Sequence, residues 1–212
     1  MKIEFVSDVA CPWCAVGLWS LDRALERIDG EIPVELRFEP FELNPSMPPE
    51  GEDAAEYIAR KYGRPPEQLA QTRAVLTERG AAVGFAFGDR QRIWNTFDAH
   101  RLLHWAGLEA GDGQSKLKHA LLAAYHARAE NPSDREVLLR AVADAGLDVE
   151  RAGAILDSDD YGAAVRARER HWQQLGIHSV PAAIVNGRHL ISGGQPPEVF
   201  EQALRQIAAA ER

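Results

Sequence analysis

Hydrophobic and polar residues alternate at the start of the chain and then change to a helical period. The alternation over Lys2–Ser7 predicts a short strand, and leucines and isoleucine spaced three and four apart predict an amphipathic helix over Pro12–Ile28. Gly30 follows as a natural helix terminator. Alternation resumes over Pro33–Phe38 as a second strand. This strand–helix–strand unit implies a parallel pair of strands with a right-handed crossover.

The middle of the chain carries only helical patterns. Pro, Gly and acidic residues over Leu43–Asp53 predict a loop that leaves the first unit. The predicted helices are Ala54–Tyr62, Pro66–Val83, Ile93–Gly107, Gln114–Ala129, Ser133–Ala145, Val149–Leu156 and Tyr161–Leu175. Ser133 and Glu136 have the spacing of a capping box, which predicts Ser133 as the N-cap of its helix.

The last forty residues return to β patterns. A short apolar run over Ala182–Asn186 is followed by Asn186-Gly187, the strongest short signal for a hairpin turn. His189–Ile191 would be the return strand, and Pro196-Pro197 opens a final amphipathic helix that runs to Ala210.

The element order is therefore β-α-β, then a helical block, then β-β-α. We expect an α/β protein in which the two outer pieces form one four-stranded mixed sheet with helices on both faces. The predicted domains are residues 1–45 together with 176–212 for the sheet domain, and 46–160 for an inserted all-helical domain. A helix over 161–175 would bridge them.

Composition and charge exclude several classes of function. The 212 residues are 45% hydrophobic and 26% charged, as in ordinary globular proteins, and carry a formal net charge of -8. An acidic chain repels phosphate backbones, so we expect no nucleic-acid partner. We also expect no membrane partner, since no apolar run reaches the roughly 20 residues that span a bilayer. The first residues do not have the pattern of a signal peptide, which predicts a cytoplasmic protein.

The chain's two cysteines lie in one Cys11-Pro12-Trp13-Cys14 motif. Two thiols this close cannot join distant segments, so a structural disulfide framework is excluded. Cys11 would stand where the first helix begins, and the positive end of a helix favours a thiolate and should lower the pKa of Cys11. Cys14, one turn further on, could resolve a mixed disulfide, while Pro12 suits the first turn and Trp13 offers substrate an apolar platform.

Two other interpretations of this motif stay open. A zinc half-site needs two further ligands, and no other cysteine exists, although a histidine pair such as His100 and His104 could supply them. We favour no metal. An inert pair of buried thiols is the other interpretation, although a helix tip is the wrong place for inert cysteines.

Motifs along nearly the whole chain resemble the DsbA-like branch of the thioredoxin superfamily, in particular the FrnE-like proteins. The segments that carry the resemblance are Phe5-x-x-Asp8-x-x-Cys11-Pro12-Trp13-Cys14-x-x-Gly17, Phe38-Glu39-Pro40-Phe41-x-Leu43-Asn44-Pro45, Asn95-Thr96-x-x-Ala99-His100-Arg101-Leu102, Gly176-x-x-x-Val180-Pro181 and Ser192-Gly193-Gly194-Gln195-Pro196. The resemblance implies a thioredoxin-like fold and dithiol oxidoreductase activity, with Cys11 as nucleophile and Cys14 as resolving thiol.

The same resemblance gives Val180-Pro181 a role. In thioredoxin-like folds a cis-proline at this point lies beside the active cysteines and exposes the backbone of the preceding residue to an extended substrate. It therefore implies that Pro181 is part of the catalytic site and that Val180 contacts substrate. An ordinary trans proline at the start of a strand is the alternative.

Two further residues, Asn95 and His100, are candidates for substrate binding. His100 and His104 lie among apolar residues on one helical face, where hydrogen-bonded core histidines are the plain interpretation. Related isomerases suggest instead that Asn95 and His100 line a cleft facing Cys11.

Three functions compete at this point. The leading hypothesis is thiol–disulfide oxidoreductase or isomerase activity on protein or low-molecular-weight substrates. It needs no cofactor beyond the redox-active disulfide, and glutathione is a candidate co-substrate. A glutathione-linked isomerase or transferase acting on an aromatic small molecule shares the architecture, but such enzymes typically have Ser at the position of Cys11. A non-enzymatic, chaperone-like binding module is the third. The chain would be a monomer or a homodimer.

Overall fold

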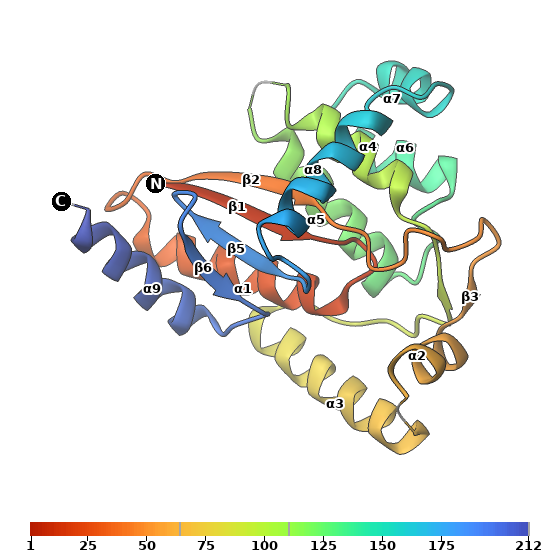
Figure 1. The fold of residues 1–212 in the computed structure, drawn as a ribbon, viewed down its shortest axis with the longest axis horizontal. Coiled ribbons are helices and arrows are strands. Elements are labelled where there is room, and N and C mark those ends of the chain that lie inside the picture. The colour runs from red at the N-terminus through yellow and green to blue at the C-terminus, as the bar shows by residue number, and fades with distance from the viewer. Residues whose placement is uncertain (64, 110, 212) are drawn as a thin grey trace.

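A four-stranded mixed sheet forms the centre of the molecule in the computed structural model, which describes residues 1–63, 65–109 and 111–211 (Figure 1). Its strands are β1 (Lys2–Ser7), β2 (Glu35–Pro40), β5 (Ala182–Val185) and β6 (His189–Ser192). They stand in the order β2-β1-β5-β6, with β1 and β2 parallel and the other pairs antiparallel. The predicted α/β mixed sheet, built from the two ends of the chain, is confirmed.

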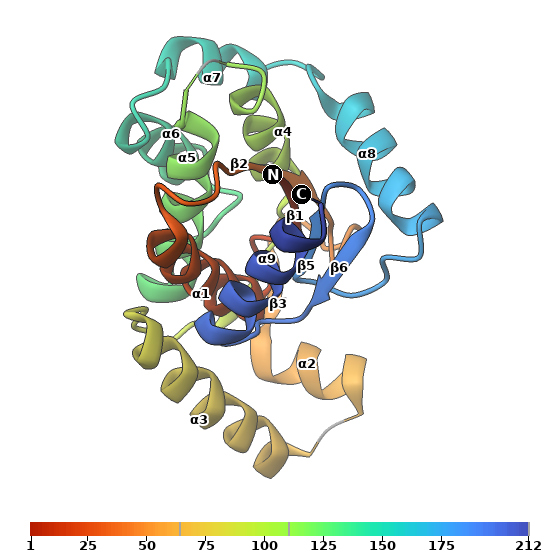
Figure 2. The same cartoon turned by 90° about the vertical axis from the view of Figure 1, so that its left-hand side faces the viewer.

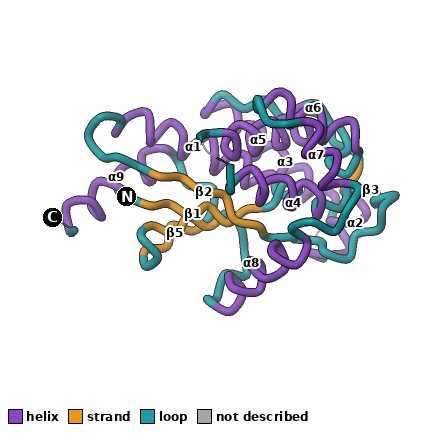
Figure 3. Tube along the Cα trace, turned by 90° about the horizontal axis from the view of Figure 1, so that it is seen from above, coloured by secondary structure: helices purple, strands orange, loops and turns teal. Residues whose placement is uncertain are grey.

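Helices cover both faces of this sheet. The α-helices among the described residues are α1 (Pro12–Ile28), α2 (Ala54–Tyr62), α3 (Pro66–Val83), α4 (Phe97–Ala106), α5 (Gly113–Leu122), α6 (Arg135–Asp144), α7 (Val149–Leu156), α8 (Gly162–Gln174) and α9 (Pro197–Ala210). Seen from above, α8 lies on one side of the strands, and α1 and α5 lie on the other (Figure 3). Helices α2 and α3 project below the body of the molecule (Figure 2).

The alternating pattern that predicted β1 places successive side chains on opposite faces of the sheet. Phe5 points into a core built with α1 and α9, which includes Leu18 and Phe200. Its neighbour Val6 packs on the opposite face against Trp172 of α8. All of these residues are buried, since a strand must cover both faces when helices lie above and below it.

Helices α4 to α7 enclose a separate core. Leu102, Leu121 and Val142 are among its fully buried members. Val9 and Ala10, which follow directly after β1, also belong to this core. The segment that leads from β1 to the cysteines is therefore held between the sheet and the helical block, which fixes the position of the following helix.

Two local predictions were wrong. The helix expected from Ile93 begins only at Phe97, because Arg92–Ile93 forms a short strand, β4, paired with β3 (Glu52–Asp53). The pairing partner lies about forty residues earlier, so the local helical pattern gave no sign of it.

The other wrong prediction concerns a helix cap. Asp134, not Ser133, is the N-cap of α6, and its carboxylate accepts the backbone N–H groups of Glu136 and Val137. The Ser133 hydroxyl donates instead to the carbonyl of Asn95. By contrast, the predicted Asn186-Gly187 hairpin is confirmed, with both residues at positive φ (50° and 70°).

Within the described residues, no helix is both long and apolar enough to cross a bilayer.

Candidate functional site

The two cysteines lie where the chain leaves β1 and enters α1. Cys11 is the N-cap of the helix, and Pro12 occupies the first turn, where its missing N–H costs no hydrogen bond. The Cys14 N–H donates to the Cys11 carbonyl at 3.1 Å, which places Cys14 one turn further in. Both are free thiols, and Cys11 keeps 4% of its surface exposed while Cys14 keeps none. Only Cys11 is therefore open to a substrate.

The loop before β5 reaches Cys11 from the other end of the chain. The Val180–Pro181 peptide bond is cis, and the Cys11 thiol donates to the Val180 carbonyl at a sulfur–oxygen distance of 3.6 Å. Gly17 allows this approach, because a Cβ at that position would lie only 3.0 Å from Pro181 Cγ. The structure thus brings Cys11, Val180 and Pro181 together, as the sequence predicted. That they act on substrate stays a prediction.

The half-buried Trp13 lies beside the turn between β6 and α9. A Cβ on Gly194 would come within 3.0 Å of the Trp13 carbonyl oxygen, so the backbone at Gly194 packs closely on the tip of α1. Arg79 of α3 donates to the Gly194 carbonyl at 2.9 Å. The projecting helix α3 is therefore anchored next to the dithiol.

A buried carboxylate lies on the inner side of the dithiol. Asp8 is fully buried and accepts the N–H groups of Ala10 (3.0 Å) and Leu43 (2.7 Å) and the Thr96 hydroxyl (2.8 Å). His100 Nε2 lies 3.3 Å from the same carboxylate. Burial acts to raise the pKa of Asp8, but the hydrogen bond and charge of His100 and the two backbone donors leave that pKa below its usual range.

Lys118 of α5 is a buried lysine, with only 1% of its surface exposed. Burial lowers the pKa of Lys118, and the charges of Cys14, Asp8 and Cys11 act against that change. Burial likewise raises the pKa of the Cys14 thiol well above its usual range, and the hydrogen bond and charge of Cys11 raise it further. The charge of Lys118 opposes that increase, so the two groups are electrically linked.

Side chains of α5 and of the helical segment that follows it anchor the helix that carries Lys118. The Gln114 side chain bonds both the N–H and the carbonyl of Phe38 on β2, and Lys118 follows one turn later. The helix then widens into a π-helix, η1 (Ala123–Ala127), whose His126 donates from Nε2 to the Val9 carbonyl at 2.8 Å. Burial and the charge of Arg90 lower the pKa of His126 to about 3, so its ring stays neutral.

The other predicted site residues are placed differently from the cysteines. His100 is buried against Asp8 rather than open to solvent. Asn95 lies just before Thr96, the N-cap of α4; its Oδ1 accepts the Phe97 N–H, and its Nδ2 donates to the Met47 carbonyl at 3.3 Å. A contact between Asn95 or His100 and substrate stays a prediction.

Sequence analysis missed Lys118 and Thr96. A usable signal for Lys118 did exist, because it is a lone cation in the apolar face that also holds Leu117, Leu121 and Leu122. Thr96 carried no such signal, since nothing local indicates that its hydroxyl meets Asp8 eighty-eight residues earlier.

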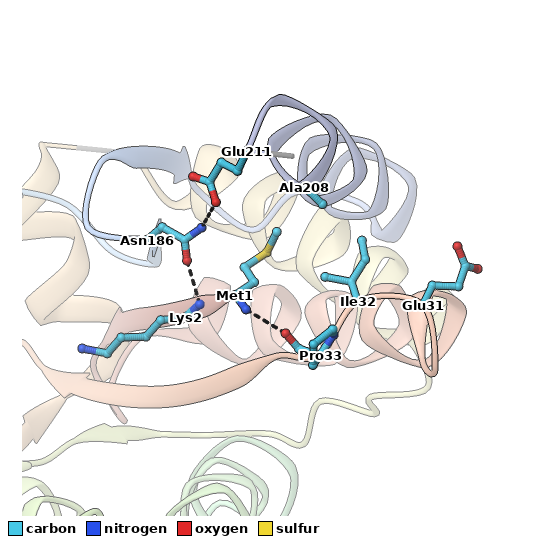
Figure 4. Close-up of a pocket in the computed structure, with 8 residues that line it drawn as sticks. All are labelled: Met1, Lys2, Glu31, Ile32, Pro33, Asn186, Ala208 and Glu211. Atoms are coloured by element: carbon cyan, nitrogen blue, oxygen red, sulfur yellow. Dashed lines mark hydrogen bonds between the residues drawn. The ribbon is translucent and has the colours of Figure 1, made fainter.

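A pocket of about 480 Å³ lies at the opposite end of the sheet (Figure 4). There Asn186 accepts the Lys2 N–H and donates to Glu211, and the amino terminus of Met1 donates to Pro33. Because β1 runs from this pocket toward Cys11, the pocket is not part of the dithiol site. Across the described residues, no group of three or more His, Cys, Asp or Glu side chains is placed to hold a metal ion.

The sheet topology and the helix-tip dithiol together define a thioredoxin-like domain. The chain belongs to the DsbA-like thioredoxin domain family, whose model matches residues 2–205. This result confirms the thioredoxin-like fold and the DsbA-like resemblance. The family is one of DsbA-like thiol oxidoreductases.

Three relatives illustrate this membership. The crystal structure of a probable DsbA oxidoreductase from Streptomyces coelicolor is 36% identical, with a TM-score of 0.90 over 100% of this chain and 91% of that one. Protein YwbO of Bacillus subtilis, described as uncharacterized, is 26% identical over 96% of each chain. The cytosolic disulfide reductase DsbM of Pseudomonas aeruginosa, solved with GSH, shares the fold at 16% identity, with a TM-score of 0.68 over 99% of this chain and 100% of that one.

Proposed function

We propose that this protein is a thiol–disulfide oxidoreductase in which Cys11 attacks the substrate and Cys14 resolves the mixed disulfide. The observation that carries the proposal is the meeting of the Cys11 thiol with the Val180 backbone at the tip of α1. An extended substrate that pairs with the backbone beside Pro181 would present its sulfur to Cys11. The partial charge at the helix N-terminus stabilises the anion from which Cys11 attacks.

The chemistry is a pair of thiol–disulfide exchanges. The Cys11 thiolate attacks one sulfur of a substrate disulfide, and the bond between the two substrate sulfurs breaks. The first substrate sulfur leaves as a thiolate and takes a proton from solvent. Cys14, as a thiolate, then attacks Cys11, forms the Cys11–Cys14 disulfide and releases the second substrate thiolate. Two electrons pass from the dithiol to the substrate, and the reverse sequence oxidises a substrate dithiol.

The substrate class follows from the surroundings of Cys11. Pro12 and Trp13 are half-buried next to it and offer an apolar platform for a polypeptide or a low-molecular-weight disulfide. The proposal includes glutathione as a co-substrate that reduces the enzyme disulfide, and a cytoplasmic location. No cofactor other than the dithiol is required by these steps.

Single cysteine variants test the proposal. Cys14→Ser should accumulate a covalent mixed disulfide with a peptide disulfide substrate, which mass spectrometry of the intact protein detects. Cys11→Ser should form none and should lose turnover of insulin disulfides. Failure of Cys14→Ser to trap any substrate would contradict the proposal.

The same variants separate the rival functions. A glutathione-linked isomerase acting on an aromatic compound should tolerate Cys14→Ser, and a binding module should be indifferent to both changes. Titration of the Cys11/Cys14 couple against a glutathione buffer then gives the reduction potential, which decides between oxidant, isomerase and reductase. Known dithiol proteins span roughly -270 to -120 mV.

A further inference from the structure

The peptide group between Val9 and Ala10, just before Cys11, is held from both sides. The Val9 carbonyl accepts a hydrogen bond from His126 Nε2 at 2.8 Å, and the Ala10 N–H of the same peptide group donates to the Asp8 carboxylate at 3.0 Å. Because a trans peptide group is planar and its N–H and C=O point in opposite directions, the two bonds fix the orientation of the whole plane. This plane cannot turn without breaking one of them.

The carbonyl side of this peptide group depends on His126. Val9 has none of its surface exposed, and His126 has only 1%, so bulk water does not reach the bond between them. On the N–H side Asp8 is itself fixed, since it also accepts the Leu43 N–H and the Thr96 hydroxyl. Loss of the imidazole would therefore leave a buried carbonyl without its donor, which the peptide group can relieve only by turning.

The imidazole of His126 is held in place by its own surroundings. It belongs to the π-helix η1, and such widened turns frequently occur at functional sites. The Gly88 N–H donates to the His126 carbonyl at 2.8 Å, and a Cβ on Gly88 would collide with the Ala127 carbonyl, so the loop before β4 packs directly on this turn. The ring centroids of Phe87 and Tyr125 lie 6.0 and 4.7 Å from that of the imidazole.

The imidazole acts here as a neutral donor. Burial and the charge of Arg90 lower the pKa of His126 to about 3, so the ring neither gains nor loses a proton at the pH values at which thiols react. Its Nε2–H is committed to the Val9 carbonyl. A neutral amide N–H in the same place could hold this carbonyl equally well, whereas a hydrocarbon side chain could not.

The orientation of this peptide group determines where Cys11 begins α1. The Cys11 N–H donates to the Asp8 carbonyl at 3.3 Å, and the Cys11 thiol contacts the Val180 carbonyl at 3.6 Å. Only Ala10 separates Cys11 from the residue whose carbonyl His126 holds. Because attack on a disulfide requires the sulfur to be aligned with the bond it breaks, a turn of this peptide group should reach the reaction directly.

We propose that His126 is a positioning residue for the dithiol: by holding the Val9 carbonyl, it fixes the peptide group that places Cys11 at the N-terminus of α1 and beside Val180. This inference rests on the proposed dithiol function, and it assigns no proton transfer to His126. Loss of the bond should leave both cysteines and α1 in place, while the Cys11 sulfur takes more orientations and reacts more slowly.

The decisive experiment compares His126→Leu with His126→Gln in a Cys14→Ser background. The Cys11 thiolate attacks oxidised glutathione and releases one glutathione thiolate, and mass spectrometry of the intact protein follows the mixed disulfide. His126→Leu should slow this step about tenfold, since even a small misplacement of a reacting group is costly. His126→Gln, whose amide N–H can reach the same carbonyl, should react at nearly the rate of the Cys14→Ser parent.

Tyr125→Phe is the matched control for damage to η1. It removes a hydroxyl that accepts a hydrogen bond from Arg90 and donates to the Arg92 carbonyl, but it leaves both bonds of the peptide group before Cys11 intact. It should lower Tm and leave the reaction rate unchanged. If it slows the reaction as much as His126→Leu does, general loosening of η1 is sufficient and the proposal is overturned.

Amide hydrogen exchange measures the orientation of the peptide group itself. The Ala10 N–H and the Leu43 N–H both donate to Asp8, but only the first belongs to the peptide group that His126 holds. His126→Leu should accelerate exchange at Ala10 about tenfold more than at Leu43, the factor expected when one hydrogen bond is weakened. An equal change at both amides would overturn the proposal.

Failure of this inference can be told apart from failure of the dithiol function. If Cys14→Ser alone forms no mixed disulfide, the dithiol function is contradicted, and exchange at Ala10 still tests the role of His126. If Cys14→Ser reacts and the added His126→Leu substitution leaves its rate unchanged, this inference alone is overturned. Slow reaction of His126→Gln with normal exchange at Ala10 would also overturn it, since the imidazole would then do more than hold a carbonyl.

A readout in the unmodified protein covers the case in which variants at position 126 do not fold. Histidine ¹⁵N NMR at neutral pH should show His126 as the neutral Nε2–H tautomer, because only that tautomer can donate to the Val9 carbonyl. The Nδ1–H tautomer would leave this carbonyl without its donor and would overturn the proposal.

Discussion

The thiol sulfur of Cys11 lies 3.6 Å from the carbonyl oxygen of Val180, although 169 residues separate them along the chain. This contact depends on β1 and β5 being neighbours in the sheet, with Phe5 opposite Ala183. The helix that follows β1 at Cys11 and the loop that leads into β5 at Pro181 therefore meet at the same end of the strands. A change that separates the two strand ends should weaken the reaction with substrate even where neither cysteine is itself altered.

A substitution at Gly17 tests how closely the chain is packed around this end of the strands. An alanine Cβ there would meet Pro181 Cγ at 3.0 Å and Gly194 Cα at 3.3 Å, so the loop must shift. We expect Gly17→Ala to destabilise the protein by about 1–2 kcal/mol, because crowding outweighs the helix propensity that alanine adds. It should also slow mixed-disulfide formation. Denaturant unfolding and stopped-flow kinetics measure the two effects.

Gly162→Ala is the matched control for Gly17→Ala. Its Cβ would lie 3.6 Å from the Phe97 ring, an ordinary contact, so stability should be equal or higher. Equal stability and equal kinetics in Gly17→Ala and wild type would show that the loop does not depend on this contact.

Asp8 should contribute most to stability when it is ionised. Asp8→Asn leaves its N–H and hydroxyl donors with an amide in place of a carboxylate, and should cost about 1–3 kcal/mol near neutral pH. The pKa of Asp8 is lowered in the folded state, so its stabilising effect is present above the unfolded value of about 3.9 and is lost as pH falls through the folded value. The difference in unfolding free energy between wild type and variant should shrink below about pH 4.

Asp144→Asn, at an exposed position on α6, is the control for Asp8→Asn and should change little at any pH. A difference between wild type and Asp8→Asn that stays constant through the acid range would contradict the assigned role of the Asp8 charge.

His119 should make stability depend on pH in the opposite direction. Burial acts to lower its pKa, but the hydrogen bond to Asp22 (2.6 Å) and the charge of Asp22 raise it above the usual value. The stabilising effect is therefore complete below the unfolded pKa of about 6.5 and is lost as pH rises through the higher folded pKa. We expect the loss of Tm in His119→Gln to be larger at about pH 6 than at about pH 8.

The exposed His171 supplies the comparison, since His171→Gln should lower Tm by little at both pH values. If His119→Gln lowers Tm more at the higher pH, the sign of the His119–Asp22 coupling is wrong.

Gln114 should determine how firmly α5 is held on the sheet. Its amide bonds the N–H and the carbonyl of Phe38 and also the Leu103 carbonyl, so that it pairs with edge strand β2 as a neighbouring strand would. Gln114→Leu should destabilise the protein by about 1–3 kcal/mol, because these backbone groups lose their partner. Hydrogen exchange at the Phe38 amide should accelerate, whereas the exposed-site control Gln173→Leu should leave it unchanged. Unaltered exchange at Phe38 would contradict this role.

The features that could be predicted from sequence are those encoded by neighbouring residues. The period change at Pro12, the helix start at Cys11 and the Asn186-Gly187 turn each depend on a few consecutive residues, and all appear in the structure. The resemblance of whole motifs extended this to the placement of Pro181 beside Cys11. The cap of α6 shows the limit, because Ser133 and Asp134 are both good caps and only the contact of Ser133 with Asn95 decides between them.

By itself, the sequence determined the dithiol, its place at a helix N-terminus and the class of fold, because these follow from local periodicity and spacing. Only the tertiary structure decided what surrounds the buried sulfur of Cys14. Lys118 and two of the donors to Asp8, the Leu43 N–H and the Thr96 hydroxyl, come from segments some thirty to one hundred residues away, and these groups meet only when the chain has folded around the end of β1. Burial then shifts the pKa values of Lys118 and Cys14, and no linear pattern encodes how deeply a single side chain is buried.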